Sequence, residues 1–240
     1  MPVFNEPATL AESAARALGA ALPEGWCARL LLVDDGSTDG TAEEVRRLGE
    51  RPGVAALLHP ANRGKGAAIR TGFARALELA ADDDAIIVQD ADLEYDAADF
   101  AGLLAPAARG EADLVLGNRW TDPPRGIKRT AHRLLNGFLT LSSNLTTGLV
   151  VRDMECCLKL FSVKAMHAIL PDLDEERFGI EPQIVASAAR HGLRVAEAPV
   201  SYAPRSFEEG KKIRMKDGLR VFVVLWRERR RTHRLLRARG

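Results

Sequence analysis

Cysteine is scarce in this chain of 240 residues: it has 3, and two of them, Cys156 and Cys157, are adjacent. So few cannot form the paired framework of a disulfide-stabilised domain, and a low count is typical of a reducing compartment. The 5 histidines lack the regular spacing of zinc ligands. The apolar run at residues 221–226 is far shorter than the roughly 20 residues that cross a bilayer. These absences exclude a disulfide scaffold and a zinc motif, and we expect a cytoplasmic protein.

An excess of one charge is also missing, because 34 Lys and Arg nearly balance 33 Asp and Glu. The charges are unevenly placed, however: 13 of the basic residues but only 4 of the acidic ones follow Pro204, so the end of the chain carries +9 and the rest −8. Such asymmetry indicates an anionic partner. A basic, partly apolar helix suits peripheral contact with the inner face of an anionic membrane; a solvated helix end is the alternative. Few aromatic residues lie between the arginines, so we expect no nucleic-acid partner.

Short apolar runs alternate with Ala-rich segments of helical period over the first 120 residues. The runs are continuous and rich in Val, Ile and Leu, which is typical of strands buried on both faces of a sheet. We predict strands at 28–33, 54–58, 85–88 and 113–116 and helices at 10–22, 41–50, 67–80 and 98–109. This alternation predicts an α/β fold with a mostly parallel, Rossmann-like sheet flanked by helices.

The second half shows no linker and no internal repeat, so we expect a single domain over residues 1–213 and a basic C-terminal helix or tail at 214–240. Its predicted elements are a helix at 130–147, a strand at 155–161, a helix at 181–190, a strand at 194–202 and a basic helix at 217–237. At the other end, residues 1–4 are too short for a complete strand, yet polar Asn5 follows them as if a strand had just ended. We therefore expect a few apolar residues to precede Met1.

Polar clusters follow the predicted strands, at the strand ends where parallel sheets bind ligands. In one cluster, Asp90 and Asp92 leave an apolar strand two residues apart, and they cannot both face an apolar core. As hard oxygen ligands they suit Mg²⁺ or Mn²⁺ held jointly with a diphosphate, and Glu94 is close enough to add a third oxygen. A solvated acidic turn is the plainer alternative.

Asp34 and Asp35 begin a second cluster. Gly36 permits a tight turn, and Ser37 or Asp39 can cap the helix that follows. Because the carboxylates accept hydrogen bonds, they suit ribose hydroxyls or base N–H groups rather than phosphate. A strand–turn–helix junction without a ligand is the alternative.

A third cluster, Asn-Arg-Gly-Lys-Gly at residues 62–66, places two cations and two glycines before a helix. Backbone amides, the positive end of the helix and Lys65 together favour an anion. The segment matches neither the P-loop nor the Gly-x-Gly-x-x-Gly fingerprint, so both common nucleotide-binding motifs are missing. A solvated basic loop is the alternative.

In this order and spacing, the clusters resemble family 2 glycosyltransferases of the GT-A fold. The matching segments are Pro2-x-x-Asn5-Glu6, residues 33–41, 62–66 and 89–96. The second half narrows the resemblance to the polyprenyl-phosphate branch, typified by dolichyl-phosphate mannose and glucose synthases, through residues 117–119, 153–161, 177–182 and 201–213. The chain departs from the family in its short opening strand and in the absence of the membrane-spanning helices that some relatives append.

The resemblance implies a role for each matching position, and it divides the domain into a nucleotide-sugar half (1–120) and an acceptor half (121–213). One group would bind the nucleotide sugar: Pro2, Phe4, Glu6, Asp34, Asp35, Lys65 and Asp90. The metal would be held by Asp90, Asp92 and Glu94. The acceptor phosphate would be bound by Arg119 and Arg205, helped by Arg129 or Arg133. Asp153 joins Asp90 and Asp92 as a catalytic candidate, its role open between base and positioning.

The implied reaction is the metal-dependent, inverting transfer of a hexose (mannose or glucose) from a UDP- or GDP-sugar to a polyprenyl or dolichyl phosphate. The metal and Lys65 would neutralise the leaving diphosphate. A phosphate acceptor is already anionic and needs arginines rather than a base. A hydroxyl acceptor, the alternative within the family, would need a base such as Asp153 or Glu181. A sugar-nucleotide pyrophosphorylase is a second enzyme class, but the Gly-rich first loop that it requires is missing.

Overall fold

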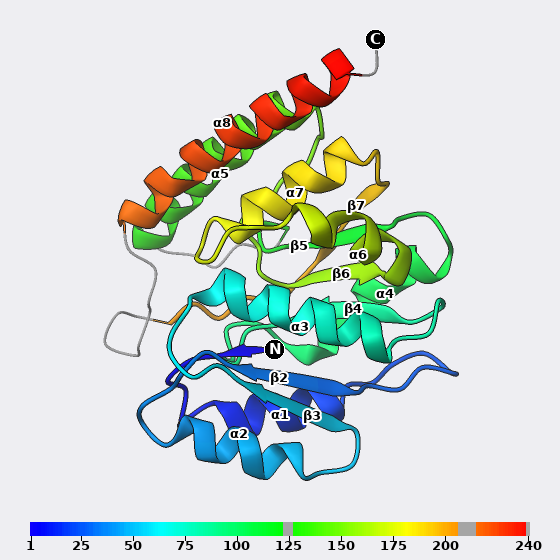
Figure 1. The fold of residues 1–240 in the computed structure, drawn as a ribbon, viewed down its shortest axis with the longest axis vertical. Coiled ribbons are helices and arrows are strands. Elements are labelled where there is room, and N and C mark those ends of the chain that lie inside the picture. The colour runs from blue at the N-terminus through cyan, green and yellow to red at the C-terminus, as the bar shows by residue number, and fades with distance from the viewer. Residues whose placement is uncertain (122–126, 206–214, 239–240) are drawn as a thin grey trace.

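The computed structural model describes residues 1–121, 127–205 and 215–238, and the side chains of all of these except 127–132, 215–219 and 233–238. Figure 1 shows two sheets at the centre with helices on both faces, and a pair of long helices at one end. No helix in the described part of the chain is long and apolar enough to span a membrane.

The first sheet is parallel and has the strand order β1 (Pro2–Val3), β2 (Leu30–Asp34), β3 (Val54–Leu58). The second has the order β4 (Ala85–Val88), β6 (Lys159–Ser162), β5 (Leu114–Asn118), β7 (Val195–Pro199). In this sheet β5 and β7 are parallel, while β6 runs antiparallel to both of its neighbours. The predicted α/β fold with a mostly parallel sheet is confirmed, and β6 is the exception.

Helices cover both faces of the sheets because side chains along a strand alternate between two cores. Val115 lies in one core, and its neighbours Leu114 and Leu116 lie in the other. The first core is closed by α1 (Leu10–Leu18), α2 (Thr41–Gly49), η1 (Ala97–Asp99) and α4 (Phe100–Ala108). The second is closed by α3 (Lys65–Leu79), α6 (Val163–Ile169), η2 (Leu170–Asp172) and α7 (Ile180–Arg190). The apolar runs predicted as strands contribute residues to both cores.

The predicted elements of the first 120 residues are present with ends shifted by a few residues. Ser37 does not cap α2: the N-cap is Gly40 at φ 90°, and Asp39 accepts a hydrogen bond from the Thr41 N–H at 3.2 Å. The short α6 was not predicted, although Ser162 caps it by accepting from the Ala165 N–H at 3.1 Å. A helix of only 7 residues is too short for its periodicity to stand out.

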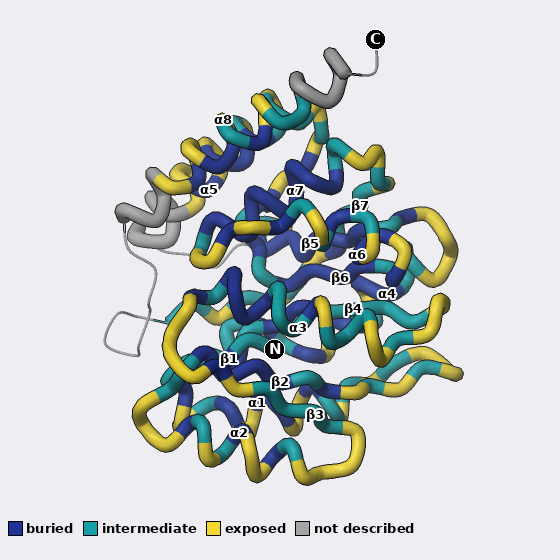
Figure 2. The backbone as a smooth tube through the Cα atoms, in the orientation of Figure 1, coloured by how far each residue is buried: buried dark blue, intermediate teal, exposed yellow. Residues whose placement is uncertain are grey.

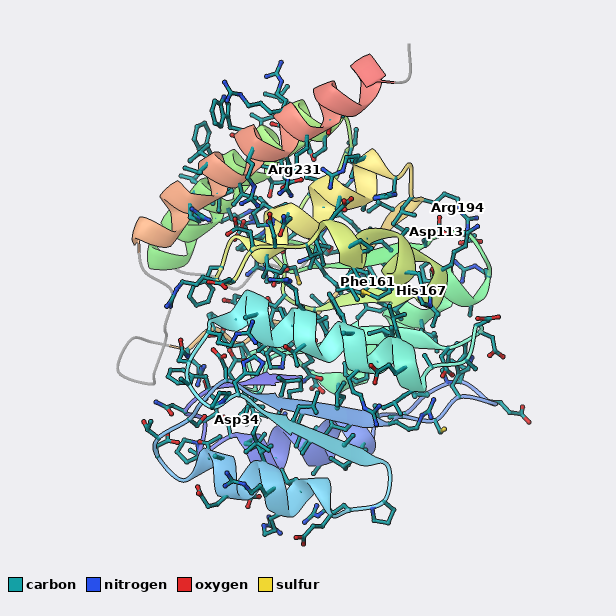
Figure 3. All side chains as sticks on the ribbon, viewed as in Figure 1. Asp34, Asp113, Phe161, His167, Arg194 and Arg231 are labelled. Carbon is teal, nitrogen blue, oxygen red and sulfur yellow. The ribbon has the colours of Figure 1, made fainter. Side chains whose placement is uncertain are left out.

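Two long helices, α5 (Ile127–Thr147) and α8 (Met215–Ala238), lie side by side beyond α7 (Figure 1). Val221 and Leu225 of α8 are buried in the same core as α7. Glu228, only 1% exposed, accepts from Arg190 of α7 at 2.6 Å and from Arg231 at 2.9 Å. Figure 3 shows Arg231 between α8 and α7. Some charged residues of the basic tail therefore hold α8 against the body of the protein.

Candidate functional site

A pocket of about 570 Å³ opens where β1, β2 and β3 end. Asp34 of β2 is buried beneath it (Figure 3), and its Oδ2 accepts from the Gly36 and Ser37 N–H groups at 3.2 and 3.1 Å. The other oxygen, Asp34 Oδ1, accepts no hydrogen bond from any described residue. A buried acceptor without a donor in a pocket indicates a ligand that brings an N–H or O–H group. The lining residues include Phe4, Asp34, Thr38, Arg46, His59 and Asn62.

Asp35, which we expected at the nucleotide, has its oxygens engaged within the protein. They accept from the Arg63 and Gly64 N–H groups at 2.9 and 2.7 Å, and His59 Nδ1 lies 2.8 Å from Oδ1. With 2% of its surface exposed, this carboxylate holds the basic loop against the end of β2. Its contacts are those of a positioning residue.

Lys65 begins α3 and reaches across to the end of β4. Its Nζ donates to Asp90 Oδ2 at 2.7 Å and to Cys157 Sγ at 2.9 Å, and lies 3.5 Å from Glu181 Oε1. Burial disfavours the ammonium, but Asp90 and the other negative groups outweigh it, so the pKa of Lys65 is well above its usual value. A fixed cation therefore stands beside the first predicted metal ligand.

The two glycines of the basic loop are required by close packing. A Cβ on Gly64 would lie 2.3 Å from the Glu176 carbonyl oxygen, and one on Gly66 would lie 2.3 Å from that of Glu175. Segment 175–177 thus runs directly against the first turn of α3, and Glu176 O accepts from the Ala67 N–H at 3.0 Å. The sequence predicted an anion site from the backbone amides, the helix end and Lys65, and the structure adds that the two glycines leave room for this segment.

Arg205 contacts three acidic residues, Glu6, Asp92 and Glu94, which together with Asp90 form an acidic cluster. Its guanidinium donates to both oxygens of Glu6 at 2.8 and 3.1 Å and to Asp92 Oδ2 at 3.2 Å, while its backbone N–H donates to Glu94 Oε1 at 3.0 Å. Burial and the charges of Asp90 and Glu94 raise the pKa of Asp92 to about 7. The predicted acceptor arginine is thus paired with two of the predicted ligand carboxylates.

The acidic cluster fits a divalent metal by its chemistry. Its carboxylates are hard oxygen donors, and the charges of Asp90 and Glu94 add to burial in raising the pKa of Asp92, so a bound cation would favour its charged form. In the described residues no group of three His, Cys, Asp or Glu side chains is arranged around a common point. Asp90 is paired with Lys65 and Asp92 with Arg205.

Arg119 and Asp153 form a buried ion pair. Asp153 accepts from Arg119 Nε at 2.7 Å, Nη2 at 2.6 Å and the Arg119 backbone N–H at 3.1 Å, and from Asn136 Nδ2 at 3.0 Å. Asp153 is 0% exposed, and each of its oxygens already accepts two hydrogen bonds. These are the contacts of a group that orients an arginine and not of a free base.

Aromatic rings connect the two ends of the site. The Arg119 guanidinium lies 5.0 Å from the Tyr202 ring centroid and 5.3 Å from that of Trp120. Tyr202 packs 5.4 Å from Tyr95, whose hydroxyl accepts from the Cys157 N–H at 3.3 Å, beside Lys65. Arg133 of α5 lies 6.0 Å from Trp120. The structure thus brings Arg119 and Arg133 together, whereas the Arg129 side chain lies outside the described residues.

The sequence profile described as Glycosyl transferase family 2 matches residues 1–170. The chain belongs to glycosyltransferase family 2. Over 218 residues, this family 2 glycosyltransferase is 34% identical to the undecaprenyl-phosphate 4-deoxy-4-formamido-L-arabinose transferase of Edwardsiella ictaluri. That match covers 90% of this chain and 62% of the relative, so the chain spans less than two thirds of that protein. It is also 28% identical to glycosyltransferase AglJ of Haloferax volcanii, over 94% of this chain and 69% of that protein.

The fold of this glycosyltransferase is the GT-A fold. Its chain superimposes on glucosyl-3-phosphoglycerate synthase from Mycobacterium tuberculosis with a TM-score of 0.64, covering 95% of this chain and 77% of that one at 21% identity. The structure compared is a complex with Mn²⁺, uridine diphosphate and glucosyl-3-phosphoglycerate. At this identity the likeness concerns the fold.

Several site residues of this glycosyltransferase were not predicted from the sequence. His59 and Asn136 orient Asp35 and Asp153 from other elements, and Tyr95 and Tyr202 meet only in the fold. Glu155 lies in the same region, where burial and the charge of Glu181 raise its pKa to about 7. Tyr95, Glu155 and Tyr202 lie in segments that carry the family resemblance, which was their one sequence signal, whereas His59 and Asn136 lie outside those segments. The other residues have contacts that cannot be read from sequence spacing.

Replacing Gly66 with Ala tests the packing of the basic loop. Because the new Cβ meets a backbone oxygen, the free energy of unfolding should fall by about 1–3 kcal/mol in urea titration. The control is Gly102→Ala in α4, where nothing lies within 4 Å of the added Cβ. That variant should be unchanged or up to about 1 kcal/mol more stable. Equal stability of the two variants would contradict the packing described.

Proposed function

We propose that this glycosyltransferase moves a hexose, with inversion and with a divalent metal, from a nucleoside diphosphate sugar to a polyprenyl phosphate. The observation that carries the proposal is the two-sided helix α5. On one side Asn136 contacts the buried Arg119–Asp153 pair. On the other, large apolar side chains are exposed at helical spacing: Leu134, Phe138, Leu141 and Leu145. One helix therefore joins a phosphate-binding type of cation to an apolar surface, as a lipid phosphate requires.

The donor half of the proposal rests on the Asp34 pocket. A nucleobase offers an N–H donor and a ribose offers hydroxyls, and either satisfies the unpaired Asp34 Oδ1. Lys65 stands at the next strand end, where it can neutralise charge on the leaving diphosphate. The mycobacterial structure with uridine diphosphate in the same fold supports a UDP-sugar, with a GDP-sugar as the other candidate.

A bound Mg²⁺ or Mn²⁺ would stabilise the leaving diphosphate by charge. Asp90, Asp92 and Glu94 would hold it. Arg205 would then exchange Asp92 for a new anionic partner, and the acceptor phosphate is the anion that the reaction brings. In this proposal, metal binding by the carboxylates frees Arg205 to bind the acceptor phosphate, so the two binding events are linked through one side chain.

The acceptor half needs cations and no strong base. A phosphate monoester oxygen is already charged near neutral pH, so it attacks without losing a proton to the protein. Asp153 is occupied in orienting Arg119, which agrees with that requirement. The name of the Edwardsiella relative, an undecaprenyl-phosphate transferase, supports the same acceptor class.

The reaction itself is tested with the purified full chain, Mg²⁺ or Mn²⁺, labelled UDP- or GDP-hexose and undecaprenyl phosphate. Label should pass into the organic phase, and the product should have the anomeric configuration opposite to that of the donor. Label that passes only to an added sugar hydroxyl would favour the alternative acceptor class. No transfer from either nucleotide would contradict the proposal.

Replacing Asp34 with Asn tests the nucleotide site. The Asn oxygen can still accept from Gly36 and Ser37, but its NH₂ group turns the free acceptor into a donor. UDP affinity measured by calorimetry should fall about 10- to 100-fold, the loss expected for one charge-assisted hydrogen bond. The exposed Asp39→Asn variant, in which the amide oxygen can still accept from the N–H and hydroxyl of Thr41, should bind UDP normally. Unchanged UDP binding by the Asp34→Asn variant would show that the nucleotide binds outside the Asp34 pocket.

Metal binding should depend on pH through Asp92. Its pKa of about 7 means that below this pH a proton occupies the carboxylate and competes with the metal. The apparent Mn²⁺ affinity should therefore rise with pH up to about 7, by up to about tenfold per unit, and then level off. Asp92→Asn should abolish the slope. Glu155 also has a pKa raised to about 7, and the Glu155→Gln variant should keep the pH dependence of Mn²⁺ affinity. Loss of that dependence in Glu155→Gln would show that Glu155, not Asp92, is responsible.

Membrane contact belongs, in this proposal, to an apolar face formed by α5 and α8. We expected the basic tail to make this contact, but Arg220, Arg227 and Arg231 pair with acidic residues of the body. The exposed apolar side chains of the two helices instead adjoin one another, with Phe138 and Phe222 5.7 Å apart. Trp226 extends this face, and Arg230 lies over its ring at 3.6 Å. Apolar side chains edged by arginine suit an anionic bilayer surface.

Flotation with phosphatidylglycerol-containing vesicles tests this face. Leu134 and Phe138 are 70% and 57% exposed, and Leu134→Gln/Phe138→Ser should weaken vesicle binding at least about tenfold, because each large apolar side chain contributes ~1.5 kcal/mol or more on leaving water. The control is Leu79→Gln, an exposed leucine at the end of α3, which should bind as the wild type does. Equal binding by all three proteins would contradict the assignment.

A further inference from the structure

Glu175 connects the C-terminal helix to the interior of the molecule. Its carboxylate, on a residue that is 2% exposed, accepts from Arg220 Nε and Nη2 at 3.1 and 2.9 Å and pairs with Arg227 Nη1 at 2.7 Å. Both arginines belong to α8. The Glu175 backbone N–H donates to Gln183 Oε1 of α7 at 2.8 Å. These contacts compensate the cost of burying the carboxylate.

The backbone of the same segment supports the donor site. Glu176 O accepts from the Ala67 N–H, one of the first amides of α3, which have no partner within their own helix. The Glu175 and Glu176 carbonyls lie so close to Gly66 and Gly64 that neither glycine has room for a side chain. Lys65 lies between these two glycines, and its Nζ contacts Asp90. Any shift of segment 175–176 therefore moves the backbone from which Lys65 projects.

We propose that Glu175 is a positioning residue for the donor site. By binding Arg220 and Arg227 of α8, it holds segment 175–176 against the first turn of α3 and so keeps Lys65 beside Asp90. The inference deepens the proposed function and rests on it only for the identity of the donor. It makes the seating of α8 a determinant of donor binding, although α8 contributes no side chain to the Asp34 pocket in the described residues.

Glu175 is distinct from the contacts that merely fasten α8. Arg190 and Glu228 form a separate buried pair, with side chains 4% and 1% exposed. Arg231 binds Asp174 and Glu228 but does not pair with Glu175. Removing the Arg231 contacts should loosen α8 without releasing segment 175–176, so the chain offers a matched control.

Amide hydrogen exchange of peptides covering residues 64–70 tests the proposal on the full chain without a ligand. In Glu175→Gln and Arg227→Gln, exchange there should be at least about fivefold faster than in the wild type, because opening of the Ala67–Glu176 hydrogen bond becomes easier. Arg227→Lys, which keeps the cation, should restore protection. Arg231→Gln should stay within about twofold of the wild type.

Calorimetry with UDP and Mn²⁺ gives a second readout. The Glu175→Gln and Arg227→Gln variants should bind UDP more weakly and show a raised KM for the donor with the acceptor KM unchanged. Wild-type exchange in both variants, with circular dichroism showing that they are folded, would overturn the inference, as would equal acceleration in Arg231→Gln. If Glu175→Gln does not fold, Arg227→Gln decides. Failure of the wild type to bind UDP or transfer sugar would count against the proposed function and leave the exchange result standing.

Discussion

A buried carboxylate must be compensated by a cation or by hydrogen-bond donors, and much of the site is organised by ion pairs that meet this constraint. Asp90 is paired with Lys65, Asp153 with Arg119, Glu181 with Lys159, and Asp92 and Glu6 with Arg205. Each pair joins elements far apart in the sequence, so charge neutralisation and tertiary packing specify the same arrangement. Around Asp92, burial and then the charges of Asp90 and Glu94 raise the pKa. In the proposed function, a metal ion at these carboxylates and a donor to Asp34 Oδ1 would complete the site.

The same constraint changes the meaning of the basic C-terminal region. In the sequence this region has a surplus of positive charge. In the fold, Arg220, Arg227 and Arg231 form ion pairs with acidic residues at positions 174, 175 and 228. With those arginines paired to the body, α5 and α8 leave large apolar side chains exposed, among them Leu134, Phe138 and Trp226, and Figure 2 shows exposed stretches of α8 in yellow. In our proposal this helix also joins the apolar face to the loop that holds Lys65, while membrane contact by its other basic residues stays a prediction.

Much of the fold could be predicted, because parallel strands and their crossover helices leave strong local patterns. The runs at 54–58 and 85–88 match β3 and β4 residue for residue. The antiparallel course of β6 could not be predicted, since pairing direction depends on which strands become neighbours. The same holds within the site. Asp35, Lys65, Asp90 and Arg119 were identified as chemical candidates, but the partner of each was not, because partners such as His59 and Asn136 come from distant segments.

The sequence by itself determined the alternation of strands and helices, the family, and the residue types that the strand ends display. Those properties depend on local composition and spacing. Only the tertiary structure decided which carboxylates are occupied by cations and which oxygen is free, because desolvation and ion pairing depend on neighbours that the fold supplies. It also decided that the glycines of the basic loop leave room for a backbone segment, and that one acidic residue of that segment, Glu175, binds arginines of the last helix.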